Sequence, residues 1–510
     1  MRRPAAPLIV TFGAVAGVIV VVLWQVHPSL LLSNTTITGG DTGAHVGLAA
    51  FLKSNLLPHG HVTGWDPGAY DGFALNTFYF PLPDLLAALA GFVIPFNVAF
   101  KLMTILGALT LPVAAWLFGR LAGLERPRPA VLAIATMPFL FDQTFTIYGG
   151  NLYSTMAGEY AFSLGLSFAL VFLGLAVRGM KTGRYRAWAA VILAVCILCH
   201  VLTAIFALVG AVIILVLAGP TWRRVWWMVA SVGGGLLLVS WWAVPFLLDQ
   251  AYSTNMGWLN VNTYGAVLWP GADRWAIVLA AVGTVLAVVA AVRHRQSAPL
   301  LLVVLGGLAA LTVRYDRQWT LYNVRFLPFY ILCVYLLAGY VVAEVGIGIA
   351  WGIRQLRMAV WRDAVATAEA PAPPSGDVPA PVVVPVPVMA QVTGRAPAVE
   401  MAGTPLATAT TAVAGGPTLQ SLPPRVPPRV PPPPRFAPWA PGAVVVPVVA
   451  MVAALLLVIT PLIPSLDSGL GGVLHHQFAP SSVASWADWN YSGYQNTPGA
   501  KELYDGVIPT

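Results

Sequence analysis

Charged residues are scarce in this sequence. They make up only 9% of its 510 residues, whereas 58% of the residues are hydrophobic and the mean hydropathy is +0.77. A soluble protein carries about a quarter charged residues, and so apolar a chain cannot hide its hydrophobic surface in one soluble core. The composition therefore excludes a soluble protein and predicts an all-α polytopic membrane protein.

Cysteine is scarce as well. The chain has three cysteines, Cys196, Cys199 and Cys333, and all lie in apolar runs, so no disulfide framework is indicated. Residues 196–200 read CILCH, which matches the attachment string of c-type haem. Haem attachment needs an accessible, flexible segment, and this string lies within an apolar run. Haem is therefore not expected.

The apolar runs define the predicted membrane spans, since a helix needs about 20 apolar residues to cross a bilayer. Eleven spans are predicted. They are residues 8–26, 97–119, 129–141, 160–177, two runs within 187–219 separated at His200, then 225–248, 275–292, 299–313, 326–350 and 442–463.

The chain has a net charge of +8, and the positions of its basic residues test this arrangement of spans. With a cytoplasmic N-terminus, all the basic clusters fall on the cytoplasmic side, as is typical of inner-membrane proteins. These clusters are residues 1–3, 120–128, 178–186, 223–224, 293–295 and 354–362. We therefore expect a multi-pass protein of the plasma (inner) membrane, in contact with its lipids, and no nucleic-acid binding.

The chain divides into four predicted parts. Residues 1–350 form the transmembrane core, with a first outer loop at 27–96 whose segment 84–96 lies as a helix on the outer interface. Residues 351–440 are rich in proline and are expected to be a disordered cytoplasmic linker. A last helix at 441–463 leads to an extracytoplasmic tail, 464–510. Because the tail stops without a natural terminator, we expect it to begin a further domain.

The first outer loop is the richest in polar residues. Residues 39–45 read GGDTGAH, and the two glycines permit a tight turn before a helix that runs to about Asn55. Asp41 at the start of this helix has two interpretations. It is an N-cap, with His45 one turn later on the same face. Alternatively, it is an ionised base, stabilised by the helix dipole, that takes a proton from an acceptor hydroxyl.

Other carboxylates on the outer side are candidate substrate ligands. Asp66 and Asp71 flank a Pro-Gly turn and are suited to sugar hydroxyls or a divalent cation (Mg, Mn or Ca), although turn carboxylates usually cap locally. No metal site is assigned. Glu159 opens the fourth run, where a carboxylate is costly in lipid, so we expect it to face a cavity together with Asn151.

Basic and aromatic residues complete the candidate set. Arg314 and Arg325 lie at the outer ends of two runs and are suited to phosphate; the alternatives are snorkelling or a pair with Asp316. His200 is either a substrate contact or a packed, hydrogen-bonded histidine. Tyr79 is suited to stacking on a sugar, or belongs to an interfacial aromatic belt.

One family resemblance joins these features. A first span, a long outer loop with an early Asp and an interfacial helix, and many further spans resemble the GT-C membrane glycosyltransferases. Residues 39–45 and 76–83 (NTFYFPLP) resemble a group of actinobacterial membrane proteins labelled 6-pyruvoyl-tetrahydropterin-synthase-related. The sequence shows no soluble pterin-enzyme domain and no His-triad zinc site.

The resemblance implies an enzyme of cell-wall biogenesis. It implies inverting transfer of a sugar, of arabinose or mannose type, from a polyprenyl-phosphate donor to an envelope glycan or lipid acceptor on the outer side, with Asp41 as general base. A flippase or transporter is an alternative, but no internal repeat or midplane ionisable group is evident. A non-catalytic scaffold, which binds a protein partner through the Pro-rich linker or the tail, leaves the polar first loop unexplained.

Overall fold

The computed structural model describes residues 6–253, 263–315, 322–369 and 482–493. It divides into two units, residues 1–352 with 436–510, and residues 353–435. Everything below concerns the first unit, except for the C-terminal part of one helix.

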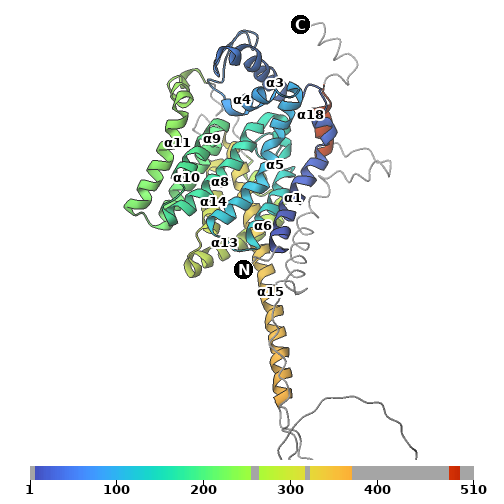
Figure 1. Ribbon diagram of the computed structural model, residues 1–510, viewed down its shortest axis with the longest axis vertical. Coiled ribbons are helices and arrows are strands. Elements are labelled where there is room, and N and C mark those ends of the chain that lie inside the picture. Colours follow the sequence, from blue (N-terminus) through green and yellow to red (C-terminus); the bar gives the residue numbers. More distant parts are fainter. Residues whose placement is uncertain (1–5, 254–262, 316–321, 370–481, 494–510) are drawn as a thin grey trace, which may run out of the picture. The chain divides into compact units, whose positions relative to one another are not determined.

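The first unit is a bundle of long helices (Figure 1). They are α1 (Ala6–Gln25), α5 (Phe96–Ala122), α6 (Arg128–Leu140), α8 (Tyr160–Thr182), α9 (Arg186–Cys199), α10 (Val201–Ala218), α11 (Trp222–Leu248), α13 (Arg274–His294), α14 (Ala298–Tyr315) and α15 (Leu327–Glu369).

Shorter elements cover one end of the bundle. Those of the first loop are α2 (Pro28–Leu31), α3 (Thr42–Phe51), the antiparallel strands β1 (Gly64–Asp66) and β2 (Phe73–Leu75), and α4 (Pro81–Ala90). Further short elements are α7 (Leu152–Ser154), the π-helical turn η3 (Thr155–Glu159), α12 (Tyr264–Leu268), η6 (Gly271–Asp273), η7 (Asn323–Phe326) and α18 (Val483–Ser492). We call this end the first-loop face and the other end the opposite face.

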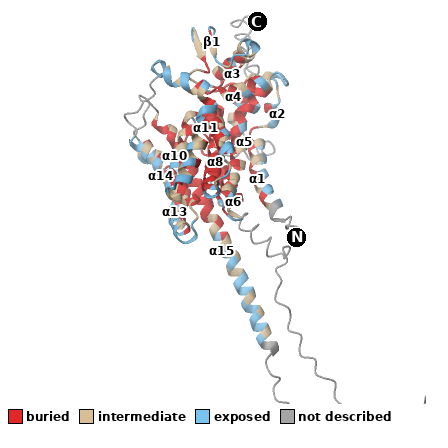
Figure 2. Ribbon diagram, turned by 60° about the vertical axis from the view of Figure 1, so that its left-hand side comes forward, coloured by how far each residue is buried: buried red, intermediate tan, exposed pale blue. Residues whose placement is uncertain are grey.

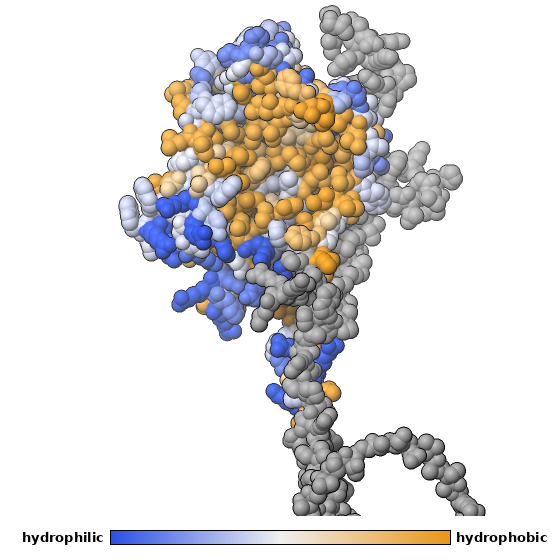
Figure 3. All heavy atoms as spheres, viewed as in Figure 1, coloured by the Kyte–Doolittle hydropathy of each residue, from blue (hydrophilic) through white to orange (hydrophobic). Residues whose placement is uncertain are grey.

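The helices confirm the predicted all-α polytopic membrane architecture. Ten of the eleven predicted runs are helices, and within the residues that the structure describes seven helices are long and apolar enough to cross a membrane by length and composition. Helices α1, α6 and α9 are apolar but shorter. The eleventh run, 442–463, lies outside the described residues. Figure 3 shows a hydrophobic band across the bundle, with hydrophilic residues at both of its edges.

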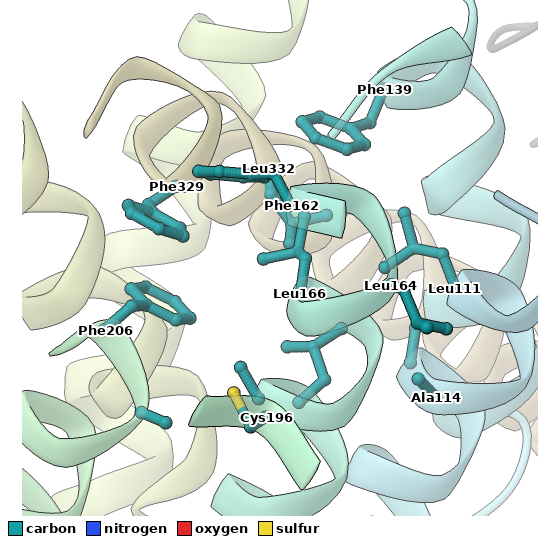
Figure 4. Packing of buried hydrophobic residues seen from close by; sticks show 14 of the residues in the cluster. Leu111, Ala114, Phe139, Phe162, Leu164, Leu166, Cys196, Phe206, Phe329 and Leu332 are labelled. Carbon is teal, nitrogen blue, oxygen red and sulfur yellow. The ribbon is translucent and has the colours of Figure 1, made fainter. Parts of the chain in front are cut away.

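Helix α8 lies at the centre of the bundle, surrounded by buried residues (Figure 2). It packs closely on α5, because a Cβ atom at Gly107 of α5 would overlap the backbone of Leu164. On its other side, Phe162 stacks against Phe329 of α15, which stacks in turn on Phe206 of α10 with ring centroids 4.5 Å apart (Figure 4). Close helix contact and stacked rings therefore hold the core.

Helices α9 and α10 form a short hairpin. Arg223 donates to Thr182 O, just before α9, and Arg224 donates to Ala218 O at the end of α10, so the N-terminus of α9 and the C-terminus of α10 lie together. The hairpin turns at His200, as predicted. Helix α9, with 14 residues, measures about 21 Å, less than the roughly 30 Å of a bilayer core, whereas α10, with 18 residues and about 27 Å, is one of the seven long helices. Helix α4 of the first loop packs above the shorter one, α9.

Two predicted boundaries need correction. The linker does not begin at residue 351, because α15 continues to Glu369. Residues 351–369 contain no proline and many good helix formers, and the first proline is Pro371. The interfacial helix begins at Pro81 rather than at 84, since proline is well suited to the first helical turn.

Candidate functional site

The Asp41 turn, residues 39–42, packs against η3. The Asp41 N–H donates to Ala157 O at 2.9 Å, and Thr42 Oγ1 donates to Met156 O at 2.9 Å. Gly40 has a φ of 51°, and a Cβ atom there would overlap Ala157 O. Glycine is therefore required at this position both by the backbone conformation and by the close approach of η3.

The Asp41 side chain does not cap its helix. Asp41 occupies the N-cap position of α3, but its φ of −79° and ψ of −5° are helical, and its carboxylate accepts no capping hydrogen bond. A capping aspartate has extended backbone angles that turn its oxygen toward the free N–H groups. The exposed carboxylate of Asp41 is thus available to a ligand.

A partly buried ion pair lies beside this carboxylate. Glu159, the last residue of η3, pairs with Arg325 of η7, and their side chains are only 12% and 21% exposed. Gly158 has a φ of 122°, and a Cβ atom there would stand 3.0 Å from Cβ of Asp41. Asp41 is near enough to Glu159 for the two carboxylates to interact electrostatically. The structure thus brings together three residues from distant parts of the sequence.

Aromatic rings surround His45 beneath the turn. The His45 ring lies 4.7 Å from that of Tyr79 and 5.5 Å from that of Tyr160, between centroids. Burial lowers the pKa of His45 to about 4, although the charge of Asp41 acts in the opposite direction. Burial raises the pKa of Tyr79, and the charge of Glu159 raises it further. Both side chains are therefore neutral at pH 7.

Asp84 is a member of this group that the sequence interpretation missed. It lies in the first turn of α4, is 1% exposed, and accepts a hydrogen bond from the Tyr160 hydroxyl at 2.7 Å. Burial raises the pKa of Asp84 to about 7, against the effect of the Tyr160 hydrogen bond. The available signal was an ionisable residue within an apolar interfacial segment.

Asn151 and His200 hold backbone groups. The Asn151 amide oxygen accepts from Ser154 N–H, and its nitrogen donates to Asp142 O and Phe145 O. All its N–H donors are therefore used within its own loop. His200 Nδ1 accepts from Leu202 N–H at 3.2 Å.

The buried His200 ring also lies 4.3 Å from Phe80 and 5.0 Å from Phe162, between centroids. This environment corresponds to the second of the two interpretations of His200, a packed and hydrogen-bonded histidine.

The other predicted ligands have contacts with residues outside the Asp41 turn, or are exposed. Asp66 accepts from the Gly68 N–H at 2.9 Å, and Asp71 is exposed in the same hairpin. Among the described residues, no three His, Cys, Asp or Glu side chains are grouped to hold a metal ion. The exposed Arg314 guanidinium lies 4.4 Å from the ring centroid of Tyr264, and Asp316 lies outside the described residues.

The family model described as 6-pyruvoyl-tetrahydropterin synthase related domain, a membrane protein, matches residues 76–345. The match covers more than half of the chain. The chain belongs to this family. The predicted family is thus confirmed, and the matched segment includes Glu159 and Arg325, whereas the Asp41 turn precedes it.

Comparison with solved structures gives matches of similar fold. No curated protein matches the sequence of this family member. Its fold is similar to the cryo-EM structure of arabinofuranosyltransferase AftD from Mycobacteria, with a TM-score of 0.47 and 15% sequence identity. The similarity covers 66% of this chain and 24% of AftD, so the chain spans about a quarter of AftD.

This PTPS-related membrane protein also has a polar cavity of about 500 Å³ on the opposite face. Its lining includes the ion pair of Arg128 with Glu344. Glu344 lies 17 residues beyond the start of α15 at Leu327, or about 26 Å along the helix. The cavity is therefore separate from the Asp41 turn.

Proposed function

We propose that this protein is a membrane glycosyltransferase that acts on the extracytoplasmic side of the membrane. It transfers a sugar of arabinose or mannose type from a polyprenyl-phosphate donor to an envelope glycan or lipid acceptor. The observation that carries the proposal is the exposed, non-capping carboxylate of Asp41 beside the Glu159–Arg325 pair. The donor and acceptor classes come from the resemblance of the first loop to the GT-C enzymes.

In the proposed reaction, Asp41 accepts the proton of the acceptor hydroxyl as its oxygen attacks the anomeric carbon of the donor. The bond between that carbon and the phosphate oxygen breaks, and the electron pair leaves with the polyprenyl phosphate. Attack opposite the leaving group inverts the anomeric configuration. Asp41 then returns the proton to solvent, for which its exposed position is suited.

Arg325 binds the donor phosphate in this proposal. A guanidinium has five N–H donors, so Arg325 can keep its pair with Glu159 and still offer donors to a phosphate. His45 is neutral at pH 7 because burial lowers its pKa to about 4. The positive charge for the phosphate therefore comes from Arg325, while Tyr79 offers a ring to the sugar.

A transfer assay with matched aspartate variants tests the proposal. Wild-type protein, Asp41→Asn and the control Asp249→Asn, which changes the C-cap of α11 outside the site, are purified in nanodiscs. Radiolabelled polyprenyl-phosphate sugars are supplied with envelope glycan fragments. We expect Asp41→Asn to lose about 10²–10⁴-fold in transfer rate and to keep donor binding within about twofold. Asp249→Asn should match wild type.

Two results would count against the enzyme. Wild-type protein that binds lipid or glycan but transfers no sugar would favour a flippase or a scaffold. An Asp41→Asn variant with wild-type turnover would remove Asp41 as the base. Repeating the assay with EDTA tests the divalent-cation alternative raised for Asp66 and Asp71, and the proposed mechanism expects no change.

A further inference from the structure

Helix α18, near the end of the sequence, is joined to the segment that leads into the Asp41 turn (Figure 1). The Thr38 N–H donates to Asn490 O at 2.9 Å, and the Thr38 hydroxyl donates to Trp489 O at 3.0 Å. The Thr35 hydroxyl donates to Tyr491 O at 2.8 Å. Three hydrogen bonds thus connect residues that lie about 450 positions apart.

The two glycines of the turn face different neighbours. A Cβ atom at Gly39 would overlap the side-chain amide of Asn490, whereas one at Gly40 would overlap Ala157 O of η3. Gly39 also has a φ of 95°, which disfavours any other residue. The turn is therefore enclosed by α18 on one side and by η3 on the other, and both set the position of Asp41.

Lys101 of α5 connects α18 to the bundle. Its ammonium is buried and lies within hydrogen-bonding distance of oxygen atoms only. These are Tyr491 O at 2.8 Å, Leu30 O at 2.9 Å, Thr35 Oγ1 at 2.6 Å, and Ser33 O and Oγ, each at 3.0 Å. No carboxylate is among these partners.

Two of the five oxygen atoms that accept from Lys101 are carbonyl oxygens at helix ends. Tyr491 lies in the last turn of α18, and Leu30 in the last turn of α2. Carbonyl groups in a last helical turn lack intrahelical donors, and the negative end of the helix dipole attracts a cation. If α18 moved away, the Lys101 ammonium would lose the Tyr491 carbonyl, one of its five hydrogen-bond acceptors, which is unfavourable.

We infer that α18 is part of the candidate site, as the element that fixes the Asp41 turn, and that Lys101 is a positioning residue that holds α18 in place. The contact of α18 with the segment before the Asp41 turn is inferred from the geometry alone. Its effect on sugar transfer rests on the proposed function.

The main test removes the ammonium in the full-length protein. Lys101→Met is compared with Lys53→Met, which changes a lysine of the first loop whose ammonium lies over the Phe92 ring. Hydrogen exchange of residues 35–41 is measured in nanodiscs. We expect at least tenfold faster exchange in Lys101→Met and no change in Lys53→Met. Unchanged exchange in Lys101→Met would overturn the inference.

A milder variant guards against misfolding of Lys101→Met. Thr38→Val is nearly isosteric and removes the hydrogen bond to Trp489 O, so exchange should accelerate about three- to tenfold. If Thr38→Val leaves the exchange of residues 35–41 unchanged, α18 does not hold the turn.

Kinetics separate positioning from general destabilisation. We expect kcat of Lys101→Met to fall at least tenfold, with the donor KM within twofold and the thermal midpoint of the bundle unchanged. Faster exchange with an unchanged kcat would overturn the positioning role. If wild-type protein transfers no sugar, the proposed function fails, whereas the exchange experiment still decides whether α18 holds the turn.

Discussion

The first loop contains two glycine-rich turns with aspartates, and the aspartate side chain has a different role in each turn. In the hairpin of β1 and β2, Asp66 accepts a hydrogen bond from Gly68, two residues away. In the Asp41 turn the backbone is held instead by η3, through Ala157 O, and the carboxylate has no capping role. The same residue type is thus a local support in one turn and an exposed acidic group in the other.

The comparison shows what decides whether an aspartate carboxylate in a turn is used as a hydrogen-bond acceptor. A turn that is held only by its own residues needs the aspartate side chain as an acceptor. A turn that is held by distant segments does not, so its aspartate remains free for chemistry. Four predictions test this contrast, and they follow in order of expected effect.

The largest effect should come from Arg325. Arg325→Met leaves Glu159 unpaired in a mostly buried position, and the loss of one partner of a buried pair costs about 3–5 kcal/mol. Urea unfolding in detergent measures this loss. The double variant Glu159→Gln/Arg325→Met should recover most of it, because no unpaired charge remains. A double variant as unstable as the single one would contradict the pairing.

Asp84 gives a pH-dependent effect. Its pKa is about 7 in the folded protein and 3.8 in the unfolded chain, so between about pH 4 and 7 the folded state holds a proton that the unfolded state has lost. The contribution of Asp84 to the free energy of unfolding therefore falls as the pH rises through this window, by on the order of 4 kcal/mol in all, and is constant above it.

Comparing wild type with Asp84→Asn isolates the contribution of Asp84 ionisation to the free energy of unfolding. The variant keeps an oxygen for the Tyr160 hydroxyl and cannot ionise, so its stability should exceed that of wild type by an amount that grows from pH 4 to pH 7. His45 acts in the opposite direction below pH 6.5, because burial lowers its pKa, but it is present in both proteins and cancels. Parallel stability curves for the two proteins would show that Asp84 does not titrate in this range.

Matched glycine substitutions compare the two turns directly. Gly40→Ala places a Cβ atom against Ala157 O at a positive φ, so we expect a loss of about 2 kcal/mol in stability and at least tenfold in transfer rate. In the hairpin, a Cβ atom at Gly68 would lie at an ordinary 3.5 Å from Asp66 Oδ1. Gly68→Ala should change the free energy of unfolding by less than about 0.5 kcal/mol. Equal losses of stability in Gly40→Ala and Gly68→Ala would show that the two turns do not differ in this way.

The smallest effect should come from the hairpin aspartate itself. Asp66→Ala removes the acceptor for the Gly68 N–H and should cost about 1 kcal/mol, whereas Asp66→Asn keeps an oxygen there and should cost less. Thermal unfolding measures both. A larger loss of sugar transfer than of stability in Asp66→Asn would show that Asp66 binds substrate after all.

Most of the fold follows from local sequence. The apolar runs, the break at His200 and the helix after Asp41 were predictable because each depends on hydrophobic length or turn chemistry within a few residues. The end of α15 was misplaced because the change in composition toward proline-rich sequence was taken as the boundary, although helix-forming residues continue to Glu369.

The site was predictable only in part. Asp41, Glu159 and Arg325 were each recognised as polar residues on the outer side, but their proximity depends on how η3 and η7 pack, which no local pattern encodes. Asp84 and Lys101 were missed, although each is an ionisable residue in an apolar segment, which is itself a signal of a special role. The partner of Lys101 on α18, the Tyr491 carbonyl, is 390 residues distant, beyond any local pattern.

The position of α18 has a consequence for how the protein is made. The Asp41 turn is synthesised long before α18, the helix that encloses it, which follows residue 482. A nascent chain that already contains α1 to α15 therefore still has an open turn. A chain whose synthesis stalls between α15 and α18 would have the helix bundle but an incomplete candidate site.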